Sequence, residues 1–253
     1  MVRLSRGLKP GVAYGNVVPS GDPPTQPLWG APIDTLRQML ADQGSIKTYA
    51  TVILSNHFVR YLVMSWSAEL VTEAEELEYA RAKFAQVHGE TALDWVIRTS
   101  GAAAGGNRLA AAVDLALISA LTRTLDASAV KFTSCQPALM AQFNAARTRI
   151  GNDAWLVSAE RTRLSIARIR DAQWYSVRTR PVNGVPVPLR ELLDQEQLLL
   201  PAGAAGDKIF LSVVDDVDID TDGLRLERLA PRRNHGLAPD VDAGVALAMA
   251  GVQ

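Results

Sequence analysis

The order of expected elements after Gly151 limits the fold of this chain more than any other feature of its sequence. Three β-branched and aromatic runs follow one another with only tight polar turns between them, and alternating helices and strands come next. Strands in hairpin order followed by alternating strands and helices predict a mixed sheet with helices on its faces. The expected elements are strands 154–159, 163–170 and 174–180, helix 189–199, strands 208–214 and 224–229, and a closing small-residue helix 240–250.

A related order of elements, less complete at its start, precedes Gly151. Two such units in tandem predict a bilobed α/β protein. We expect a first lobe over 33–151, a second lobe over 152–253 with its closing helix packed on either lobe, and an extended arm over 1–32. The prolines of this arm remove backbone donors and disfavour helix, although one short strand fits around 12–18.

The first lobe is expected to begin with a helix over 34–43, for which Asp34 is the N-cap. The strand-length runs 49–54 and 58–64 are predicted to pair as a hairpin through the turn 55–57.

Thr72 and Glu75 then form a capping box, in which hydroxyl and carboxylate satisfy the free amides at the start of a helix that Gly89 ends. Further elements are expected as strands 93–99, 108–113 and 129–134, and as helices that begin at Asp114 and Pro137.

The composition is that of a folded protein with a sizeable core and little net charge. The chain has 253 residues, 48% hydrophobic and 21% charged, and its 26 Lys and Arg against 27 Asp and Glu leave a formal charge of -1. A near-neutral total does not favour a nucleic-acid binder, which usually has a basic excess. No apolar run approaches the roughly 20 residues of a membrane span, and the basic N-terminus lacks the apolar part of a signal peptide. We therefore expect a protein of a reducing, cytoplasmic compartment.

Few side chains suit nucleophilic or metal chemistry. Cys135 is the single cysteine, and its strand setting predicts a small buried residue. Of the three histidines, His57 is expected at the surface of a turn, and His88 beside a helix C-terminus whose partial charge it favours. The chain has no Gly-x-Ser-x-Gly elbow and no P-loop. We therefore expect no catalytic residue, no cofactor and no metal.

One acidic segment matches half of a calcium-binding loop. Asp218, Asp220 and Asp222 alternate before Gly223, but position twelve is Leu229 where a bidentate glutamate belongs. The favoured alternative is a hairpin between the strands on either side, with a turn kept polar by the acids.

Arginines are concentrated in the three-strand segment of the second lobe. Strand alternation would place several of them on one sheet face or along an exposed edge. The favoured explanation is an edge protected from aggregation by charge. The functional alternative is a docking patch for an acidic partner segment or an anionic membrane surface. The candidates for partner binding are Arg161, Arg163, Arg168, Arg178 and Arg180.

Four stretches resemble the actin-like assembly proteins of bacterial type IV pilus and type II secretion platforms, the PilM-like and GspL-like group. Residues 52–66 (VILSNHFVRYLVMSW) are similar to a hairpin of their first lobe, and residues 112–121 (AVDLALISAL) are similar to the helix before their lobe crossover. Residues 130–140 (VKFTSCQPALM) are similar to the entry into their second lobe, and residues 242–251 (DAGVALAMAG) are similar to their closing helix.

Actin-like ATPases bind phosphate on two hairpins whose glycines let the backbone approach and whose aspartate positions a metal ion. The resemblance implies a first hairpin within 3–16, where no Asp-Gly pair stands, and a second within 159–165. There Glu160 supplies a carboxylate, but no glycine follows, and Arg161 and Arg163 intrude. We therefore expect a degenerate nucleotide site and a pseudo-ATPase that does not hydrolyse ATP, with weak anion binding left open.

These expectations combine into a bilobed actin-like (RNase H-like) fold, two mixed sheets with flanking helices, serving as a non-catalytic scaffold in a type IV pilus or type II secretion assembly. The expected partner is a protein, such as the cytoplasmic tail of an inner-membrane component or the assembly ATPase, bound in an interlobe groove or along a sheet edge. Peripheral association with the inner membrane is left open. The alternatives are an active actin-like ATPase, an unrelated α/β enzyme that uses Glu160, His57 or the acids of 215–222, and a structural subunit whose partners are its own copies.

Overall fold

A computed structural model describes residues 1–4, 12–18, 27–44, 47–101, 105–182, 186–200, 208–214, 217–229 and 247–248. The helices of these ranges are α1 (Gly30–Asp42), α2 (Glu73–His88), α3 (Leu115–Ala127), α4 (Ala138–Ile150) and α5 (Leu189–Leu198). None of the helices described is both long and apolar enough to cross a membrane.

The strands before α4 are β1 (Val2–Leu4), β2 (Val12–Gly15), β3 (Thr48–Leu54), β4 (Val59–Met64), β5 (Trp95–Thr99), β6 (Arg108–Asp114) and β7 (Val130–Pro137). Those after it are β8 (Ala154–Glu160), β9 (Arg163–Arg170), β10 (Gln173–Pro181), β11 (Val187–Pro188), β12 (Ile209–Val213), β13 (Ile219–Asp220) and β14 (Leu226–Arg228). Two short 3-10 turns, η1 (Asn56–Phe58) and η2 (Gly89–Asp94), precede β4 and β5.

The C-terminal part forms a five-stranded sheet in the order β10-β9-β8-β12-β14. Strands β8, β9 and β10 are an antiparallel meander, whereas β12 runs parallel to β8. Apolar clusters cover both faces of this sheet, so all seven residues of β8 are buried. The predicted succession of three strands, a helix and a strand is therefore confirmed, and the sheet is mixed.

The predicted hairpin between the last two long strands is wrong, because β14 pairs with β12 in parallel. Between these strands the chain forms β13, which pairs with β11 beside α5. The segment with β13 brings the chain back to the end of the sheet at which β12 begins. Strand β14 starts at that end and therefore runs parallel to β12. The acidic segment is thus part of a crossover.

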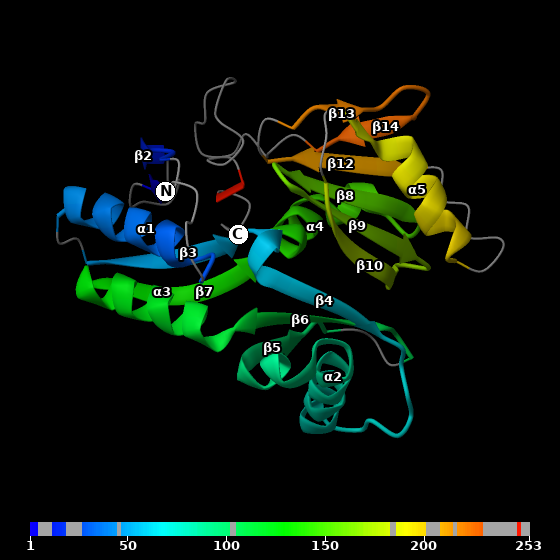
Figure 1. Ribbon diagram of the computed structural model, residues 1–253, viewed down its shortest axis with the longest axis horizontal. Coiled ribbons are helices and arrows are strands. Elements are labelled where there is room, and N and C mark those ends of the chain that lie inside the picture. Colours follow the sequence, from blue (N-terminus) through cyan, green and yellow to red (C-terminus); the bar gives the residue numbers. More distant parts are fainter. Residues whose placement is uncertain are drawn as a thin grey trace.

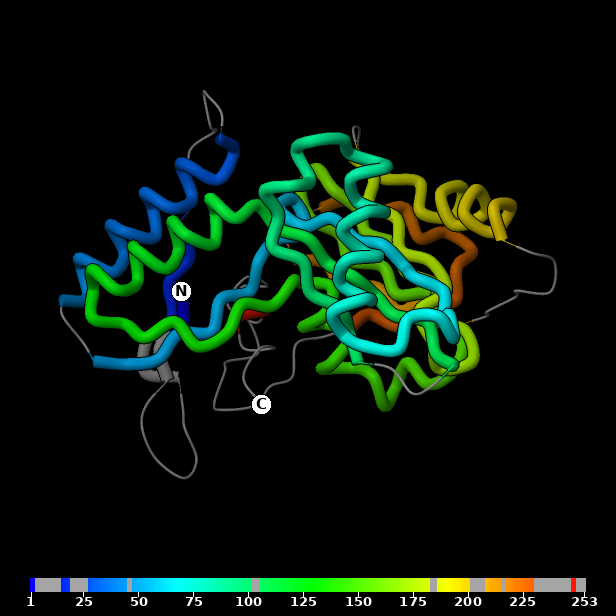
Figure 2. The backbone as a smooth tube through the Cα atoms, turned by 90° about the horizontal axis from the view of Figure 1, so that it is seen from below, coloured from blue at the N-terminus to red at the C-terminus, as the bar shows by residue number. Residues whose placement is uncertain are grey.

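The N-terminal strands form smaller sheets. Strands β1 and β2 pair as an antiparallel ribbon, and β3 pairs with β7 in parallel. Helices α1 and α3 lie side by side over β3 and β7, at the end of the molecule away from α5 (Figures 1 and 2). Their contact residues include Ile33 and Leu36 of α1 and Leu117 and Leu121 of α3.

A third unit lies along the chain between β3 and α3. Its antiparallel sheet has the order β4-β6-β5, and α2 packs on one face through Ala80 and Phe84. The predicted capping box is confirmed, because the Thr72 hydroxyl accepts from the Glu75 amide while the Glu75 carboxylate accepts from the Thr72 amide. We call this unit, residues 59–114, the insert.

The predicted hairpin of 49–54 and 58–64 has the right strands and the wrong pairing. Strands β3 and β4 belong to different sheets, since η1 redirects the chain between them and each strand has another partner. The turn is stabilised locally by the Ser55 hydroxyl, which accepts a hydrogen bond from the His57 amide.

The start of the first helix also differs from expectation. Helix α1 begins at Gly30 with Trp29 as its N-cap, and Asp34 instead forms an ion pair with Arg37 inside the helix. Pro32 is accommodated because the first-turn amides of a helix have no intrahelical acceptor. The predicted strand in the arm is β2, and most of the rest of the arm and of the closing helix 240–250 lies outside the described residues.

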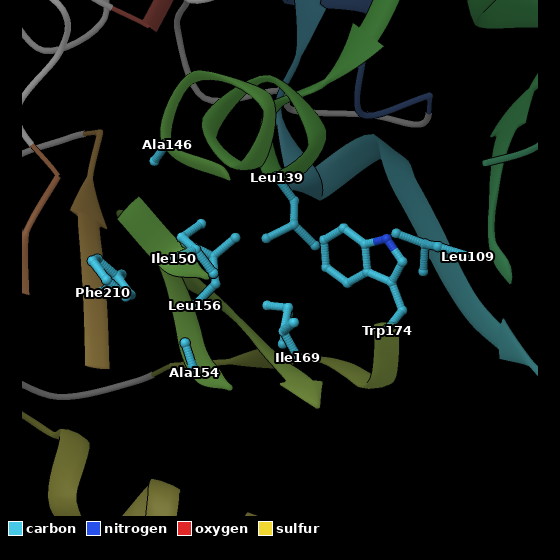
Figure 3. Close-up of a cluster of buried hydrophobic side chains, with 10 residues drawn as sticks. Leu109, Leu139, Ala146, Ile150, Ala154, Leu156, Ile169, Trp174 and Phe210 are labelled. Carbon is cyan, nitrogen blue, oxygen red and sulfur yellow. The ribbon is translucent and has the colours of Figure 1, made fainter. Parts of the chain in front are cut away.

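One apolar cluster joins the insert, α4 and the five-stranded sheet. Figure 3 shows the ring of Trp174 from β10 between Leu139 of α4 and Leu109 of β6. The rings of Trp174 and Phe143 are 4.6 Å apart, and Tyr61 and Val63 of β4 pack against the same cluster. The insert sheet is therefore packed between α2 and β10 (Figure 1).

Candidate functional site

The two halves of the chain are joined by a buried polar contact where β3 turns into β4 and β8 turns into β9. Glu160, the last residue of β8, is 4% exposed. One of its carboxylate oxygens accepts from the Asn56 amide at 2.9 Å, and the other accepts from the Ser55 hydroxyl. We call Ser55, Asn56, Ser158 and Glu160 the joint.

Asn56 is the centre of this joint and has no exposed area. Its side-chain amide donates to the Ser158 hydroxyl at 3.1 Å. Its carbonyl oxygen accepts from the Tyr61 hydroxyl at 2.6 Å and from the Leu139 amide in the first turn of α4 at 3.2 Å. Because α4 lacks a side-chain cap of its own, Asn56 supplies an acceptor from a distant part of the chain.

The environment of the joint shifts the pKa of Tyr61. Burial raises its pKa well above the usual range, and the nearby Glu160 carboxylate raises it further. The phenol therefore stays protonated and keeps its hydrogen bond to Asn56.

The joint occupies the position at which the resemblance implies a second phosphate-binding hairpin. The connection from β8 to β9 is the turn Arg161-Thr162, and the Glu160 carboxylate is directed at Ser55 and Asn56. Both oxygens of the Glu160 carboxylate are therefore hydrogen-bonded to residues of the same chain. Half of the first implied hairpin, residues 5–11, falls outside the described residues.

Beside the joint lies a groove of about 170 Å³ between the segment that leads into α1, η1, the start of α3 and the insert. Most of its lining residues are aromatic or aliphatic, its polar residues are His57, Arg60 and Asp114, and its exposed lining is about as polar as it is apolar. The apolar lining consists of Pro27, Leu28, Trp29, Phe58, Trp95, Ala112 and Leu117. A concave surface that combines apolar side chains with a few polar groups is the usual form of a binding site.

Both N-terminal histidines lie close to this groove. His57, expected at the surface, is half-buried in η1, and its Nε2 is 3.4 Å from the Thr162 hydroxyl. His88 packs on Trp95 with a ring separation of 5.0 Å. Burial and then Arg60 lower the pKa of His88, so its neutral form is favoured in spite of its place at the end of α2. The third histidine, His235, is outside the described residues.

The predicted arginine patch is divided between the two faces of the sheet. Arg168 has no exposed area, lies 5.5 Å from the Trp155 ring and donates to the Ile169 carbonyl. A side chain without exposed area cannot contact a partner, so Arg168 is removed from the predicted surface.

Arg178 and Arg180 form ion pairs with the buried Glu196 of α5, at 3.0 and 2.5 Å. They hold α5 against the sheet, although Arg178 is still half exposed. Arg161 is exposed in the turn before β9, and Arg163 begins β9 on the opposite face from Arg178 and Arg180. A partner-binding role for Arg161, Arg163, Arg178 and Arg180 stays a prediction.

The acidic segment is engaged in local contacts. Asp220 accepts from the Asp222 amide, and Arg190 of α5 donates to the carbonyls of Asp222 and Gly223. No group of three or more potential ligands is arranged to hold a metal within the ranges described. Cys135 is half-buried in β7, and burial raises its thiol pKa to about 11.

The sequence interpretation missed the joint and the groove. Ser55 and Asn56 read as ordinary turn residues, because nothing local indicates that their partners follow about 100 positions later. The only signal was that two small polar residues interrupt a long apolar run.

The arrangement of sheets and the insert defines the class of protein: a bilobed actin-like fold, as predicted. No family model and no curated protein matches the sequence. Among solved structures, the chain is similar to a chain of the PilM-PilN type IV pilus biogenesis complex, with a TM-score of 0.59 and 13% identity over 100% of this chain and 95% of that one.

A second similar structure is the cytoplasmic domain of EpsL, an inner membrane component of the type II secretion system of Vibrio cholerae. The TM-score is 0.54 at 9% identity, over 86% of this chain and 79% of that one. The predicted PilM-like and GspL-like fold is confirmed, and at these identities the similarity concerns the fold alone.

Proposed function

We propose that this chain is a non-catalytic cytoplasmic scaffold of a type IV pilus or type II secretion assembly at the inner membrane. Its fold is shared with a chain of the PilM-PilN pilus biogenesis complex and with EpsL of a secretion system. Its partner is a protein, such as the short cytoplasmic tail of an inner-membrane component.

The joint supports the absence of ATP hydrolysis. An actin-like ATPase needs backbone and carboxylate groups free to face phosphates and a metal ion. Here the Glu160 carboxylate is buried against Ser55 and Asn56, and Arg161 and Thr162 stand in the turn that would face the phosphates. The apolar packing of Trp174 between α4 and the insert further opposes opening of the two halves.

The groove supports partner binding and is the observation on which the proposal mainly rests. Its walls place Trp29, Phe58, Trp95 and Leu117 around one depression. Aromatic side chains around a concave site are typical anchors for a short peptide segment, since they bury a large area with little loss of side-chain entropy.

A photo-crosslinking residue at Leu28, on the exposed rim of the groove, tests this proposal in the native cell. The matched control is the same residue at Leu198, which is exposed at the far end of α5. We expect position 28, and not position 198, to capture an inner-membrane pilus or secretion component through its cytoplasmic tail. Equal capture from both positions, or none from position 28, would contradict the binding role.

Calorimetry with MgATP tests the non-catalytic part separately. We expect no heat of binding at micromolar protein and nucleotide concentrations. Binding at micromolar affinity, with release of phosphate, would establish the active ATPase instead.

A further inference from the structure

Arg60 is the cation of the groove, and it has no anionic partner in the described part of the chain. Its Nη1 donates only to the carbonyls of His57 and Val59, both at a long 3.3 Å. None of the ion pairs among the described residues includes Arg60. A half-buried guanidinium with two weak hydrogen bonds retains donors for a further acceptor.

Arg163 adds a second positive charge from the other half of the molecule. The start of β9 contacts η1 beside the groove, and Arg163 acts on Arg60 through space: burial first, and then Arg163, lower the pKa of Arg60. The Nε of Arg163 is itself buried without a hydrogen-bond partner. Two like charges held together with unused donors are unfavourable unless an anion binds between or beside them.

Asp114, the acid that lines the groove, is already engaged. Its Oδ1 caps α3 by accepting from the Ala116 amide at 2.7 Å. Glu160, the acid of the joint, accepts hydrogen bonds from Ser55 and Asn56. The positive charge of Arg60 is therefore not neutralised by a carboxylate dedicated to it.

One wall residue of the groove carries a buried donor without an acceptor. The indole Nε1 of Trp29, a wall residue, is buried and has no hydrogen-bond partner. Around Arg60 the walls carry aromatic and aliphatic side chains next to polar ones. The site thus complements a ligand that presents a charged acceptor next to an apolar side chain.

We propose that the groove binds a peptide segment in which an Asp or Glu stands close to an aromatic or aliphatic anchor. The anchor packs against Phe58, Trp95 and Leu117, and the carboxylate binds Arg60, with Arg163 contributing attraction across the joint. This inference rests on the proposed function and specifies the chemistry of the partner.

Peptides selected from a randomised phage-displayed library on the full-length protein provide the probe. Those that cross-link to position 28 are groove binders, and synthetic versions with the acid changed to its amide are compared by calorimetry. We expect the amide to bind the wild-type protein about tenfold more weakly, and to bind the Arg60→Met variant within about twofold of the acid.

Arg98→Met is the matched control, because Arg98 lies on the same sheet, donates to one carbonyl and does not line the groove. It should retain the tenfold preference for the acid. Arg60→Met should melt no lower than the wild type, since it removes a partly buried cation and its repulsion with Arg163. A lower melting temperature would indicate a structural role and contradict the inference.

Groove-binding peptides without an acid, or an acid preference that survives Arg60→Met, would overturn this inference while leaving the proposed function standing. Failure of any peptide to cross-link at position 28, together with no capture of a membrane component in the cell, would overturn both.

Discussion

The five-stranded sheet and the strands before α4 follow one plan but are completed to different degrees. In each, antiparallel strands come first, a helix follows, and parallel strands complete the unit. In the C-terminal half, hydrogen bonds run unbroken across β10, β9, β8, β12 and β14. In the N-terminal half, the described strands outside the insert divide into the ribbon β1–β2 and the pair β3–β7.

Burial follows the same division. Every residue of β8 is buried, whereas Leu54 is the one buried residue of β3. The insert interrupts the N-terminal unit between β3 and α3, and the groove lies where the insert meets α1 and α3. The C-terminal sheet is thus the more deeply buried of the two, and we expect it to contribute more to stability, whereas the groove proposed for binding lies in the N-terminal half.

The largest effect is expected where the two regions meet. Trp174→Ala removes the ring that packs against Phe143, Leu109 and Leu139, and should lower the free energy of unfolding by about 4 kcal/mol. Trp66→Ala, at a half-exposed tryptophan, should cost less than about 1 kcal/mol. Urea unfolding measures both, and a small effect at Trp174 would mean that the halves are stabilised separately.

The polar joint comes next. Asn56→Ala leaves the Leu139 amide, the Tyr61 hydroxyl and the Ser158 hydroxyl without their partner, and should cost about 3 kcal/mol. Tyr61→Phe removes one of these bonds and should cost about 1 kcal/mol. Equal costs for the two variants in denaturant titrations would show that Asn56 is not the centre of the joint.

A matched pair of valines compares the two regions directly. Val157→Ala in β8 removes methyl groups from a side chain with no exposed area, and should cost about 2 kcal/mol. Val52→Ala, at a half-buried position of β3, should cost about half as much, since less apolar area is buried there. Thermal or chemical unfolding measures the loss of stability in each variant. An equal loss in the two variants would contradict the proposed difference between β3 and β8.

The smallest effect concerns the start of α2 in the insert. Thr72→Ala removes the capping hydroxyl and should lower the free energy of unfolding by about 1 kcal/mol, which urea unfolding measures.

Hydrogen bonds from the Thr72 backbone and hydroxyl lower the pKa of Glu75, so the carboxylate stabilises the fold at neutral pH. This stabilisation should fade as the pH falls through that lowered pKa, and melting curves of the wild type and Glu75→Gln should converge in acid.

Local features of the sequence were sufficient for most elements. The capping box of α2, the Asp114 cap of α3 and the meander β8–β9–β10 were all predictable, because caps, tight turns and strand alternation depend on neighbouring residues. The two predicted hairpins failed for the opposite reason. Strand β3 pairs with β7 and β12 pairs with β14, and the residues of the predicted turns do not indicate these distant partners.

The candidate site was less predictable than the fold. Glu160 was identified as the carboxylate of a degenerate hairpin, and the structure places it in the joint. The arginines were grouped by proximity in sequence, whereas burial of Arg168 and the ion pairs of Arg178 and Arg180 with Glu196 separate them. The residues next to Arg60 in the sequence do not distinguish it from other arginines. Its proposed role in binding depends on the groove that it lines and on Arg163, which interacts with it in the folded chain.

By itself the sequence determined the helices, the strands and their order, since these follow from backbone propensity and the spacing of apolar side chains along a few neighbouring residues. Tertiary structure alone decided which strands pair, that Asn56 and Glu160 meet, and that Arg60 lines a groove and interacts with Arg163. Those outcomes depend on groups about 100 residues apart, whose desolvation and charge take effect only when the chain has brought them together.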